Sequence, residues 1–312
     1  MGTSVLRAFV VTALVAAPAA LAAQPGRFRS GVELVTVGVT VIDDEGHVVP
    51  DLTADDFELY VEGDRQEIAY FARGDAFVRP GEPGLQRLRL GLLFDTSGSM
   101  DRDIKLSRTA AVRFLNSLQE AVDITLVDFD TEVRVARFEQ ASFPLLVERI
   151  RERKPDGWTA LYDALGTYLD GSYDLNGRKI LVLYSDGGDT RSTMTFSEAL
   201  DMLRASDVTL YALGFLEHQP ASVRNAQRMR LMQMAEVTGG EAFFPSSTRT
   251  LDGIYERIAT QIRAQYSLGF IPADGPVDGA WRRLQVRLAG RHPKGVKVRA
   301  RPGYFAPLRA NP

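Results

Sequence analysis

Oxygen-bearing side chains lie next to three predicted elements of regular structure. The apolar run from Leu88 to Phe94 predicts a strand entering a core, and it ends at Asp95-Thr96-Ser97-Gly98-Ser99. Asp186 follows a second apolar run, from Lys179 to Tyr184, and Thr159 comes directly before a predicted helix. Hydroxyl and carboxylate oxygens are hard ligands that suit Mg²⁺, with Mn²⁺ or Ca²⁺ as the other choices. The candidate metal ligands are Asp95, Ser97, Ser99, Thr159 and Asp186.

Strands and helices alternate between residues 87 and 264, and this order predicts where the oxygens meet. Strands are predicted at 88–94, 122–129, 132–138, 179–184, 208–213 and 242–244, and helices at 103–120, 144–152, 160–169, 196–205, 223–237 and 251–264. Repeated βα units predict an α/β domain with a doubly wound, mostly parallel sheet and helices on both faces. The carboxyl ends of its strands share one edge, so Asp95 and Asp186 should converge there, with Thr159 arriving from a loop above.

Each of these segments also has a purely structural explanation. Residues 97–99 could cap the following helix, and Asp186-Gly187-Gly188 could form a turn. Their joint occurrence, in this order between predicted strands and helices, favours a shared site. Asp189 could be a supporting acceptor or a turn residue, and Asp163 fits the helix that follows Thr159.

Two segments with strand patterns flank this block. Residues 24–86 contain an alternating valine run that starts at Val35, predicted strands at 57–61 and 67–71, and a Gly/Pro-rich linker at 73–86. Residues 265–312 contain predicted strands at 265–271, 282–288 and 296–301. Each segment alone has too few strands to bury much core. We therefore expect one β-sandwich built from both segments, with the α/β domain inserted between them.

Several charged motifs in the flanks have alternative explanations. The acidic residues 43–45 could bind calcium, but turns favour Asp for backbone reasons. Thr53 and Asp56 predict the cap of a short helical turn. From Trp281 to Pro312 there are nine Lys or Arg residues and no Asp or Glu. This segment could dock on an anionic envelope polymer or an acidic partner, although alternating basic and apolar residues favour the solvated face of an antiparallel sheet.

Composition excludes several function classes. The chain has 312 residues, of which 25% are charged and 45% hydrophobic, and this is the composition of an ordinary globular protein. Its net charge of -3 gives no indication of nucleic-acid binding. It contains no cysteine, which excludes disulfides, thiolate zinc sites, cysteine nucleophiles and lipid anchoring through cysteine. The three histidines, at 47, 218 and 292, are isolated in sequence, and we expect plain surface residues rather than catalytic groups.

Residues 1–23 have the pattern of a cleavable signal peptide. Arg7 precedes an apolar segment from Ala8 to Leu21, and Ala20-Leu21-Ala22 provides small residues for a signal peptidase. The segment is short and contains Pro18, which disfavours a membrane span, although an uncleaved anchor is the alternative. Cleavage would release a mature protein without an integral membrane segment. A cysteine-free exported chain suggests a secreted or periplasmic protein of a bacterium.

The three oxygen-rich motifs resemble those of the von Willebrand factor type A domain and its metal-ion-dependent adhesion site. The family's Asp-x-Ser-x-Ser motif is matched by residues 95–99, its threonine loop by 157–163 and its Asp-Gly motif by 185–189. The resemblance covers about residues 88–264 and implies that Ser97, Ser99 and Thr159 coordinate the metal, with Asp95 and Asp186 coordinating directly or through water. Trp158 departs from the glycine often found at that place, and its indole could line a binding surface.

The flanking segments extend the resemblance to nearly the whole mature chain. Residues 32–35, 51–57 and 301–304 are similar to exported bacterial proteins related to this family. The resemblance implies a secreted adhesion or scaffold module, without enzymatic activity, that captures an Asp or Glu of a protein partner through a divalent cation. Neutral hydroxyl ligands leave such a cation attractive to an incoming carboxylate.

Two alternatives from other classes stay open. A metal-dependent hydrolase or phosphotransferase could use an aspartate after a strand, but the chain lacks a second Asp at position 97, and Arg102 is the one basic residue between Asp95 and Asp103. The serine motif is not Gly-x-Ser-x-Gly, which disfavours a serine hydrolase. A structural envelope protein, in which a metal has no role beyond stability, is the third possibility.

Overall fold

The computed structural model describes residues 34–74, 88–118, 121, 123–173, 175, 177–272, 278–290 and 295–306. The predicted signal peptide, most of the predicted linker and His292 lie outside the described residues. No helix in the described ranges is both long enough and apolar enough to cross a membrane.

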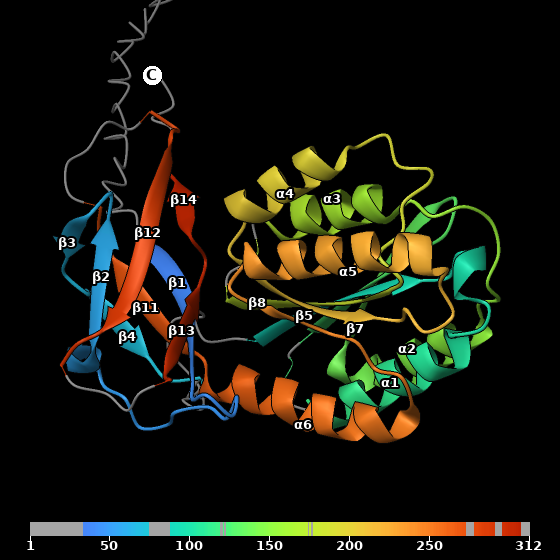
Figure 1. The fold of residues 1–312 in the computed structure, drawn as a ribbon, viewed down its shortest axis with the longest axis horizontal. Coiled ribbons are helices and arrows are strands. Elements are labelled where there is room, and N and C mark those ends of the chain that lie inside the picture. The colour runs from blue at the N-terminus through green and yellow to red at the C-terminus, as the bar shows by residue number, and fades with distance from the viewer. Residues whose placement is uncertain are drawn as a thin grey trace, which may run out of the picture. The chain divides into compact units, whose positions relative to one another are not determined.

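A six-stranded sheet forms the centre of the α/β domain, in the order β10-β9-β8-β5-β6-β7 (Figure 1). Its strands are β5 (Leu88–Asp95), β6 (Asp123–Phe129), β7 (Val133–Glu139), β8 (Arg178–Ser185), β9 (Val208–Gly214) and β10 (Glu241–Phe243). All neighbouring pairs are parallel except β6 and β7. The mostly parallel sheet is therefore confirmed, with β7 as an antiparallel edge strand.

Helices cover both faces of this sheet, as the repeated βα units predict (Figure 1). One face carries α1 (Ile104–Ser117), α2 (Phe143–Glu152) and α6 (Thr248–Ala264), and the other carries α3 (Leu161–Ser172), α4 (Phe196–Ala205) and α5 (Ala221–Glu236). Each layer has its own apolar core. Because β5 and β8 are buried on both faces, their sequences are nearly continuous apolar runs instead of alternating ones.

The flanking segments form two antiparallel sheets that share one core. One sheet has the order β13-β1-β11-β4 and the other β14-β12-β2-β3. The strands are β1 (Val35–Ile42), β2 (Phe57–Val61), β3 (Asp64–Gln66), β4 (Tyr70–Ala72), β11 (Tyr266–Phe270), β12 (Trp281–Leu288), β13 (Lys297–Ala300) and β14 (Gly303–Phe305). Apolar side chains from both sheets, such as Val39, Leu59 and Leu268, pack into one cluster. Each sheet contains strands from both ends of the chain, which confirms the shared architecture.

Some strand boundaries differ from the sequence-based predictions, because the geometry of single turns determines where those strands end. The strand predicted at 67–71 is present only at 70–71, where β4 begins, and residues 67–69 connect β4 to the preceding strand β3. Glu62 and Gly63, with φ of 51° and 99°, close the β2–β3 hairpin in a two-residue turn that requires positive φ at both positions. The predicted capping box of Thr53 and Asp56 is present at a short 3-10 turn. Strand β14 was not predicted from the sequence, since its three residues are too short to show a periodicity.

The basic C-terminal segment has two environments. Arg287 is exposed on the solvent face of β12, as an antiparallel sheet face predicts. Arg299 on β13 instead forms an ion pair with Glu241 at the start of β10, and Arg257 of α6 contacts the same carboxylate at 2.9 Å. The prediction of a solvated face is therefore correct for β12 and wrong for Arg299, which contacts the α/β part of the chain.

Candidate functional site

Asp95 ends β5 at the carboxyl edge of the sheet, with none of its surface exposed. Its Oδ1 accepts hydrogen bonds from the Ser97 backbone N–H at 3.0 Å and from the Ser97 hydroxyl at 2.6 Å. Its Oδ2 accepts a hydrogen bond from the Ser185 hydroxyl at 2.6 Å. The carboxylate is therefore oriented by its own loop on one side and by strand β8 on the other.

The hydroxyls of Ser97 and Ser99 lie next to this carboxylate. Their oxygens are 3.1 Å apart. Burial raises the pKa of Asp186, and the Ser99 hydroxyl partly opposes that rise. Ser97 is completely buried, whereas Ser99 is exposed. Ser97 precedes a 3-10 turn, Gly98–Met100, but its side chain makes no capping hydrogen bond there. The Ser97 side chain thus points to the Asp95 carboxylate and does not cap the turn.

Asp186 directly follows β8 and is 1% exposed. Its Oδ1 accepts the Gly188 N–H at 2.8 Å, so the predicted Asp-Gly-Gly turn is also present. Its Oδ2 accepts a hydrogen bond from the Gln219 side-chain amide at 2.7 Å. Gln219 comes from the loop between β9 and α5, a segment that sequence reasoning did not connect with the site.

Thr159 lies in a loop whose backbone is hydrogen-bonded to the other loops of this edge. The Asp156 N–H donates to the Thr96 carbonyl at 3.0 Å, and the Gly157 carbonyl accepts from the Gly98 N–H at 3.2 Å. On the other side, the Thr159 N–H donates to the Thr190 hydroxyl at 3.0 Å. Thr159 is 4% exposed, and its hydroxyl makes no hydrogen bond within the described part of the chain.

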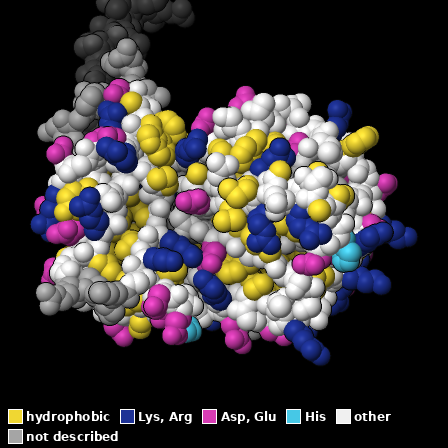
Figure 2. All heavy atoms as spheres, viewed as in Figure 1, with side chains coloured by type: hydrophobic (Ala, Val, Ile, Leu, Met, Phe, Trp, Pro, Cys, Tyr) yellow, Lys and Arg dark blue, Asp and Glu magenta, His cyan; other side chains and the backbone are white. Residues whose placement is uncertain are grey.

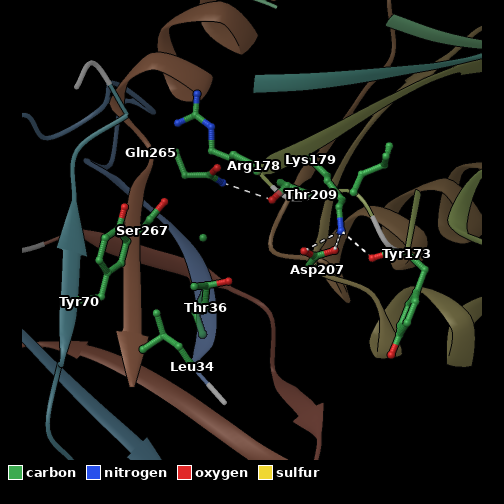
Figure 3. Close-up of a pocket in the computed structure, with 14 residues that line it drawn as sticks. Leu34, Thr36, Tyr70, Tyr173, Arg178, Lys179, Asp207, Thr209, Gln265 and Ser267 are labelled. Atoms are coloured by element: carbon green, nitrogen blue, oxygen red, sulfur yellow. Dashed lines mark hydrogen bonds and ion pairs between the residues drawn. The ribbon is translucent and has the colours of Figure 1, made fainter. Parts of the chain in front are cut away.

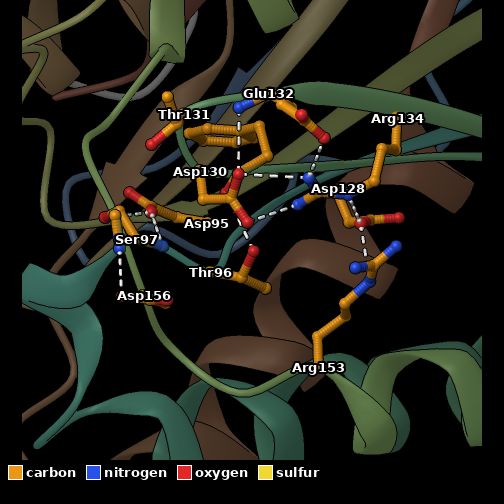
Figure 4. A network of polar contacts seen from close by, with 12 residues as sticks. Asp95, Thr96, Ser97, Asp128, Asp130, Thr131, Glu132, Arg134, Arg153 and Asp156 are labelled. Atoms are coloured by element: carbon orange, nitrogen blue, oxygen red, sulfur yellow. Dashed lines mark hydrogen bonds and ion pairs between the residues drawn. The ribbon is translucent and has the colours of Figure 1, made fainter.

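An ion-pair network beside the site fixes the turn between β6 and β7 (Figure 4). Arg134 donates to Asp128 at 2.7 Å and to Asp130 at 2.6 Å, and Arg149 and Arg153 also contact Asp128. Burial opposes ionisation of Asp130, but its hydrogen bonds with Arg134 outweigh that effect and lower its pKa.

The turn held by this network supports the threonine loop through two backbone hydrogen bonds. The Ala160 N–H donates to the Asp130 carbonyl at 2.8 Å, and the Trp158 N–H donates to the Thr131 hydroxyl at 2.9 Å. The ion pairs therefore position the backbone on both sides of Thr159, although none of their side chains belongs to the oxygen cluster.

The electrostatics of Asp95 and Asp186 differ from those of the other buried carboxylates. Burial, followed by the nearby charge of Asp186, raises the pKa of Asp95 to about 7, against the lowering effect of its hydrogen bonds with Ser185 and Ser97. Burial likewise raises the pKa of Asp186. Two neighbouring carboxylates in a region of low dielectric disfavour each other's ionisation.

Basic partners are present at the other buried aspartates but not at these two. Asp103 contacts His218 at 2.8 Å, Asp123 pairs with Arg89 and Arg137, and Asp128 pairs with three arginines. In the described ranges no Lys, Arg or His side chain forms an ion pair with Asp95 or Asp186. A buried negative charge requires a compensating positive one, and the described residues supply none at this position.

The side-chain contacts connect two carboxylates and two hydroxyls, those of Asp95, Asp186, Ser97 and Ser99. Thr159, the fifth candidate, is tied to the neighbouring loops through its backbone. No three His, Cys, Asp or Glu side chains converge anywhere in the described residues in a way that could hold a metal ion. The hydroxyls are therefore essential to any cation site at this edge. This mixture of oxygens fits a hard divalent cation that retains some water ligands.

Asp163 and Asp189, whose roles the sequence left open, both accept hydrogen bonds from neighbouring loops. Asp163 accepts hydrogen bonds from the Thr193 and Met194 backbone N–H groups at 2.9 and 3.0 Å, and so joins the start of α3 to the loop before α4. Asp189 accepts from the Ser192 hydroxyl and from the Tyr162 N–H. Both residues organise loops, and neither enters the oxygen cluster.

Sequence reasoning missed three residues that contact the cluster or lie beside it. Ser185 could have been recognised, because it occupies the last position of β8 as Asp95 does of β5. Gln219 carries no local signal. His218 was expected to be a plain surface residue, but it contacts the buried Asp103 from the same loop. His218 lies at the surface as expected, with 47% of its side chain exposed, and its added contact with Asp103 depends on the path of the loop after β9.

A cavity of about 330 Å³ lies near the opposite edge of the sheet (Figure 3). Its polar wall includes Lys179, which donates to both oxygens of Asp207 at 2.8 and 3.0 Å, and Gln265, which donates to Thr209 at 3.3 Å. These residues belong to strand beginnings. The cavity is therefore separate from the oxygen cluster at the strand carboxyl ends.

The exposed side of α5 forms another surface. Val223, Met229 and Met232 are exposed there, and Arg228 stacks on the Phe244 ring with 3.8 Å from its guanidinium carbon to the ring centroid. Figure 2 shows apolar and basic side chains intermixed on this side of the molecule.

Three solved structures are similar to this chain at low identity. The vWF domain of the type V pili tip protein Mfa5 from Porphyromonas gingivalis is 13% identical with a TM-score of 0.46, covering 56% of this chain and 96% of that one. A von Willebrand factor type A protein from Catenulispora acidiphila is 12% identical with a TM-score of 0.46, covering 91% and 76%. Proximal thread matrix protein 1 from the mussel byssus is 15% identical with a TM-score of 0.40, covering 57% and 46%.

The middle of the chain matches one protein family. None of the curated proteins matches this chain. Residues 90–257, slightly more than half of the chain, match the von Willebrand factor type A domain, and the match includes the loops of Asp95, Thr159 and Asp186. The chain therefore belongs to the von Willebrand factor type A domain family.

Proposed function

We propose that this protein is a non-catalytic binding module that uses a divalent cation to capture an Asp or Glu side chain of a protein partner. The observation that carries the proposal is the pair of buried carboxylates, Asp95 and Asp186, which are linked through the neighbouring hydroxyls of Ser97 and Ser99 and have no basic partner in the described ranges. A cation of charge +2 would supply the missing compensation.

The residues that would hold the cation are those predicted from the sequence: Asp95, Ser97, Ser99, Thr159 and Asp186. With neutral hydroxyls as direct ligands and the aspartates coordinating through water, the cation would stay incompletely neutralised. Its chemistry, when bound, is electrostatic attraction of an incoming carboxylate in a site that is partly shielded from water. The protein's own contribution is to orient the two aspartates and to keep them apart from any competing arginine or lysine, while a bound cation would favour their ionised form.

Mg²⁺ is the first choice, with Mn²⁺ and Ca²⁺ as alternatives. The site offers few charged ligands, and Mg²⁺ commonly retains several waters beside one or two carboxylates. Family membership supports a binding role. The predicted signal sequence at 1–23 supports a secreted or periplasmic location, where a partner on the cell envelope would be accessible.

A thermal-unfolding titration tests the proposal. Mg²⁺ or Mn²⁺ should raise the unfolding midpoint of the mature protein, because a ligand that binds only the folded state stabilises it. Ser97→Ala should remove most of that rise. Ser172→Ala is the matched control, since it deletes a buried hydroxyl that donates to Leu169 on α3, outside the cluster. A metal-free protein that shows no response to any divalent cation would refute the proposed site.

A second measurement separates binding from catalysis. Capture of a partner from an envelope extract should require the cation and should be reversed by a chelator. Hydrolysis of a generic phosphate ester that is lost in Asp95→Asn would instead favour the enzyme alternative. A cation response with neither capture nor turnover would favour the structural envelope protein.

A further inference from the structure

One large aromatic side chain stands exposed directly beside the oxygen cluster. Trp158 is 63% exposed, while the next residue, Thr159, is 4% exposed. Tryptophan buries a large apolar area when it is covered, and it is among the residue types most enriched at energetically dominant interface positions. An indole left in water at this position is therefore a candidate contact residue.

The backbone that carries the indole is held on both sides. The Trp158 N–H donates to the Thr131 hydroxyl at 2.9 Å, and the following Ala160 N–H donates to the Asp130 carbonyl at 2.8 Å. Gly157 has φ of +72°, and a Cβ there would lie 2.4 Å from the Thr131 hydroxyl. The loop is thus seated closely on the β6–β7 turn, and this fixed backbone lowers the entropy cost of using Trp158 for binding.

The indole itself makes no hydrogen bond, ring stacking or cation–π contact with any described residue. It therefore offers a free apolar face and one unused N–H donor. Other exposed apolar side chains, such as Leu145 and Tyr173, are not adjacent in sequence to any of the five candidate ligands.

Resting on the function proposed above, we propose that Trp158 selects the partner sequence: the captured segment carries an apolar side chain one or two residues from its Asp or Glu. The carboxylate would be recognised at the oxygen cluster, and the apolar side chain would cover the indole. A segment with glycine at the neighbouring positions would bind weakly, because it would leave the indole in water.

Phage-displayed random dodecapeptides test this proposal, because they sample acidic residues beside every kind of neighbour. The mature protein is panned in Mn²⁺, and bound phage are eluted with a chelator. Selected sequences should share an Asp or Glu with an apolar neighbour. Peptides selected in parallel on Trp158→Ala should still contain the acidic residue but should lose the apolar neighbour. A synthetic peptide of the sequence selected on the unaltered protein should bind Trp158→Ala about 30-fold more weakly than it binds the unaltered protein.

Tyr173→Ala is the matched control, since it removes another exposed aromatic side chain. Tyr173 is 81% exposed, and its carbonyl accepts from Lys179 at the start of β8, about 20 Å along the strand from the cluster. This variant should select the same peptides as the unaltered protein.

Each outcome separates the two proposals. An acidic consensus with no apolar neighbour, or with the same neighbour in Trp158→Ala, overturns the role of Trp158 and leaves cation-dependent capture intact. Absence of chelator-eluted acidic peptides overturns the capture function and the role of Trp158 together. An apolar preference that depends on Trp158 but persists in Ser97→Ala overturns the link between the indole and the cation site.

Discussion

The Ser185 hydroxyl donates a hydrogen bond to Oδ2 of Asp95 at 2.6 Å, and so joins the last residues of two neighbouring parallel strands. The register of β5 and β8 pairs Phe94 with Tyr184, which places the next residues, Asp95 and Ser185, side by side. Because side chains alternate between the faces of a sheet, both point to the same side. Ser185 therefore orients the aspartate whose other oxygen contacts Ser97.

Ser185→Ala should weaken cation binding about 10-fold, since partners that orient a metal ligand commonly contribute 10- to 100-fold in affinity. The substitution removes a hydrogen bond that lowers the pKa of Asp95, so the carboxyl should also be harder to ionise. Titration calorimetry with Mn²⁺ measures the affinity. Ser172→Ala should leave it unchanged, and equal affinities in Ser185→Ala and the unaltered protein would contradict this role.

The response to cation should depend on pH. Because burial and the charge of Asp186 raise the pKa of Asp95 to about 7 in the folded state, the metal-free folded protein holds more protons than the unfolded chain between about pH 4 and 7. The free energy of unfolding of the metal-free protein should therefore fall as pH rises through this window. Cation binding needs ionised carboxylates, so the gain in unfolding midpoint should grow from about pH 5.5 to about pH 8.

Thermal-unfolding series with and without Mg²⁺ at each pH check both trends. Asp95→Asn provides the control, because an amide cannot titrate and should abolish most of the pH dependence of the cation effect. A cation-induced shift of constant size across that pH range would contradict the assignment of Asp95.

The convergence of the candidate residues could be predicted because Asp95 and Asp186 are tied to strand ends. Asp95 and Asp186 follow long apolar runs, and parallel pairing brings such ends to one edge. Hydroxyl residues at Ser97, Ser99 and Thr159 then complete a pattern that is specific as a set. The sandwich could be predicted for a related reason, since neither flanking segment has enough strands to bury a core by itself.

The parts that escaped prediction depend on loop paths and on long-range ion pairs. Gln219 reaches Asp186, and His218 reaches Asp103, only because the β9–α5 loop bends back over the sheet edge. No periodicity encodes that path. Arg299 looks like any alternating surface residue in sequence, and its partner Glu241 is 58 positions away.

Gly157→Ala should impair the threonine loop. The residue would have to adopt φ of +72° with a Cβ that meets the Thr131 hydroxyl, so we expect a loss of about 1–3 kcal/mol in unfolding free energy. The cation-induced shift should also shrink, because the loop carries Thr159. Denaturant unfolding and Mg²⁺ titration measure the two effects.

Gly171→Ala is the matched control for that substitution. Gly171 lies in α3, and a Cβ there would meet no atom within 4 Å. Alanine should raise stability by up to about 1 kcal/mol, because glycine is the poorer helix former. If both substitutions had the same effect, the close seating of Gly157 on Thr131 would not control the loop.

The sandwich should fold without the α/β domain when its two segments are joined directly. Strands β4 and β11 are antiparallel neighbours, and Ala72 pairs with Ser267. The end of β4 therefore lies beside the start of β11, although the α/β domain separates the two strands in the sequence. The α/β domain therefore occupies the place of a hairpin connection. We expect a chain in which a short Gly/Ser linker replaces residues 75–263 to unfold cooperatively, because all strands around the shared core are retained.

Residues 24–86 alone should lack a cooperative transition, since β1 and β2 would lose their partners β11, β13 and β12. Circular dichroism during heating distinguishes the two chains. Cooperative unfolding of residues 24–86 alone would show that the N-terminal segment is an independent unit. Failure of the joined chain to fold would show that contacts such as Glu241 with Arg299 are required, and that the α/β domain is a structural support of the sandwich as well as an insertion.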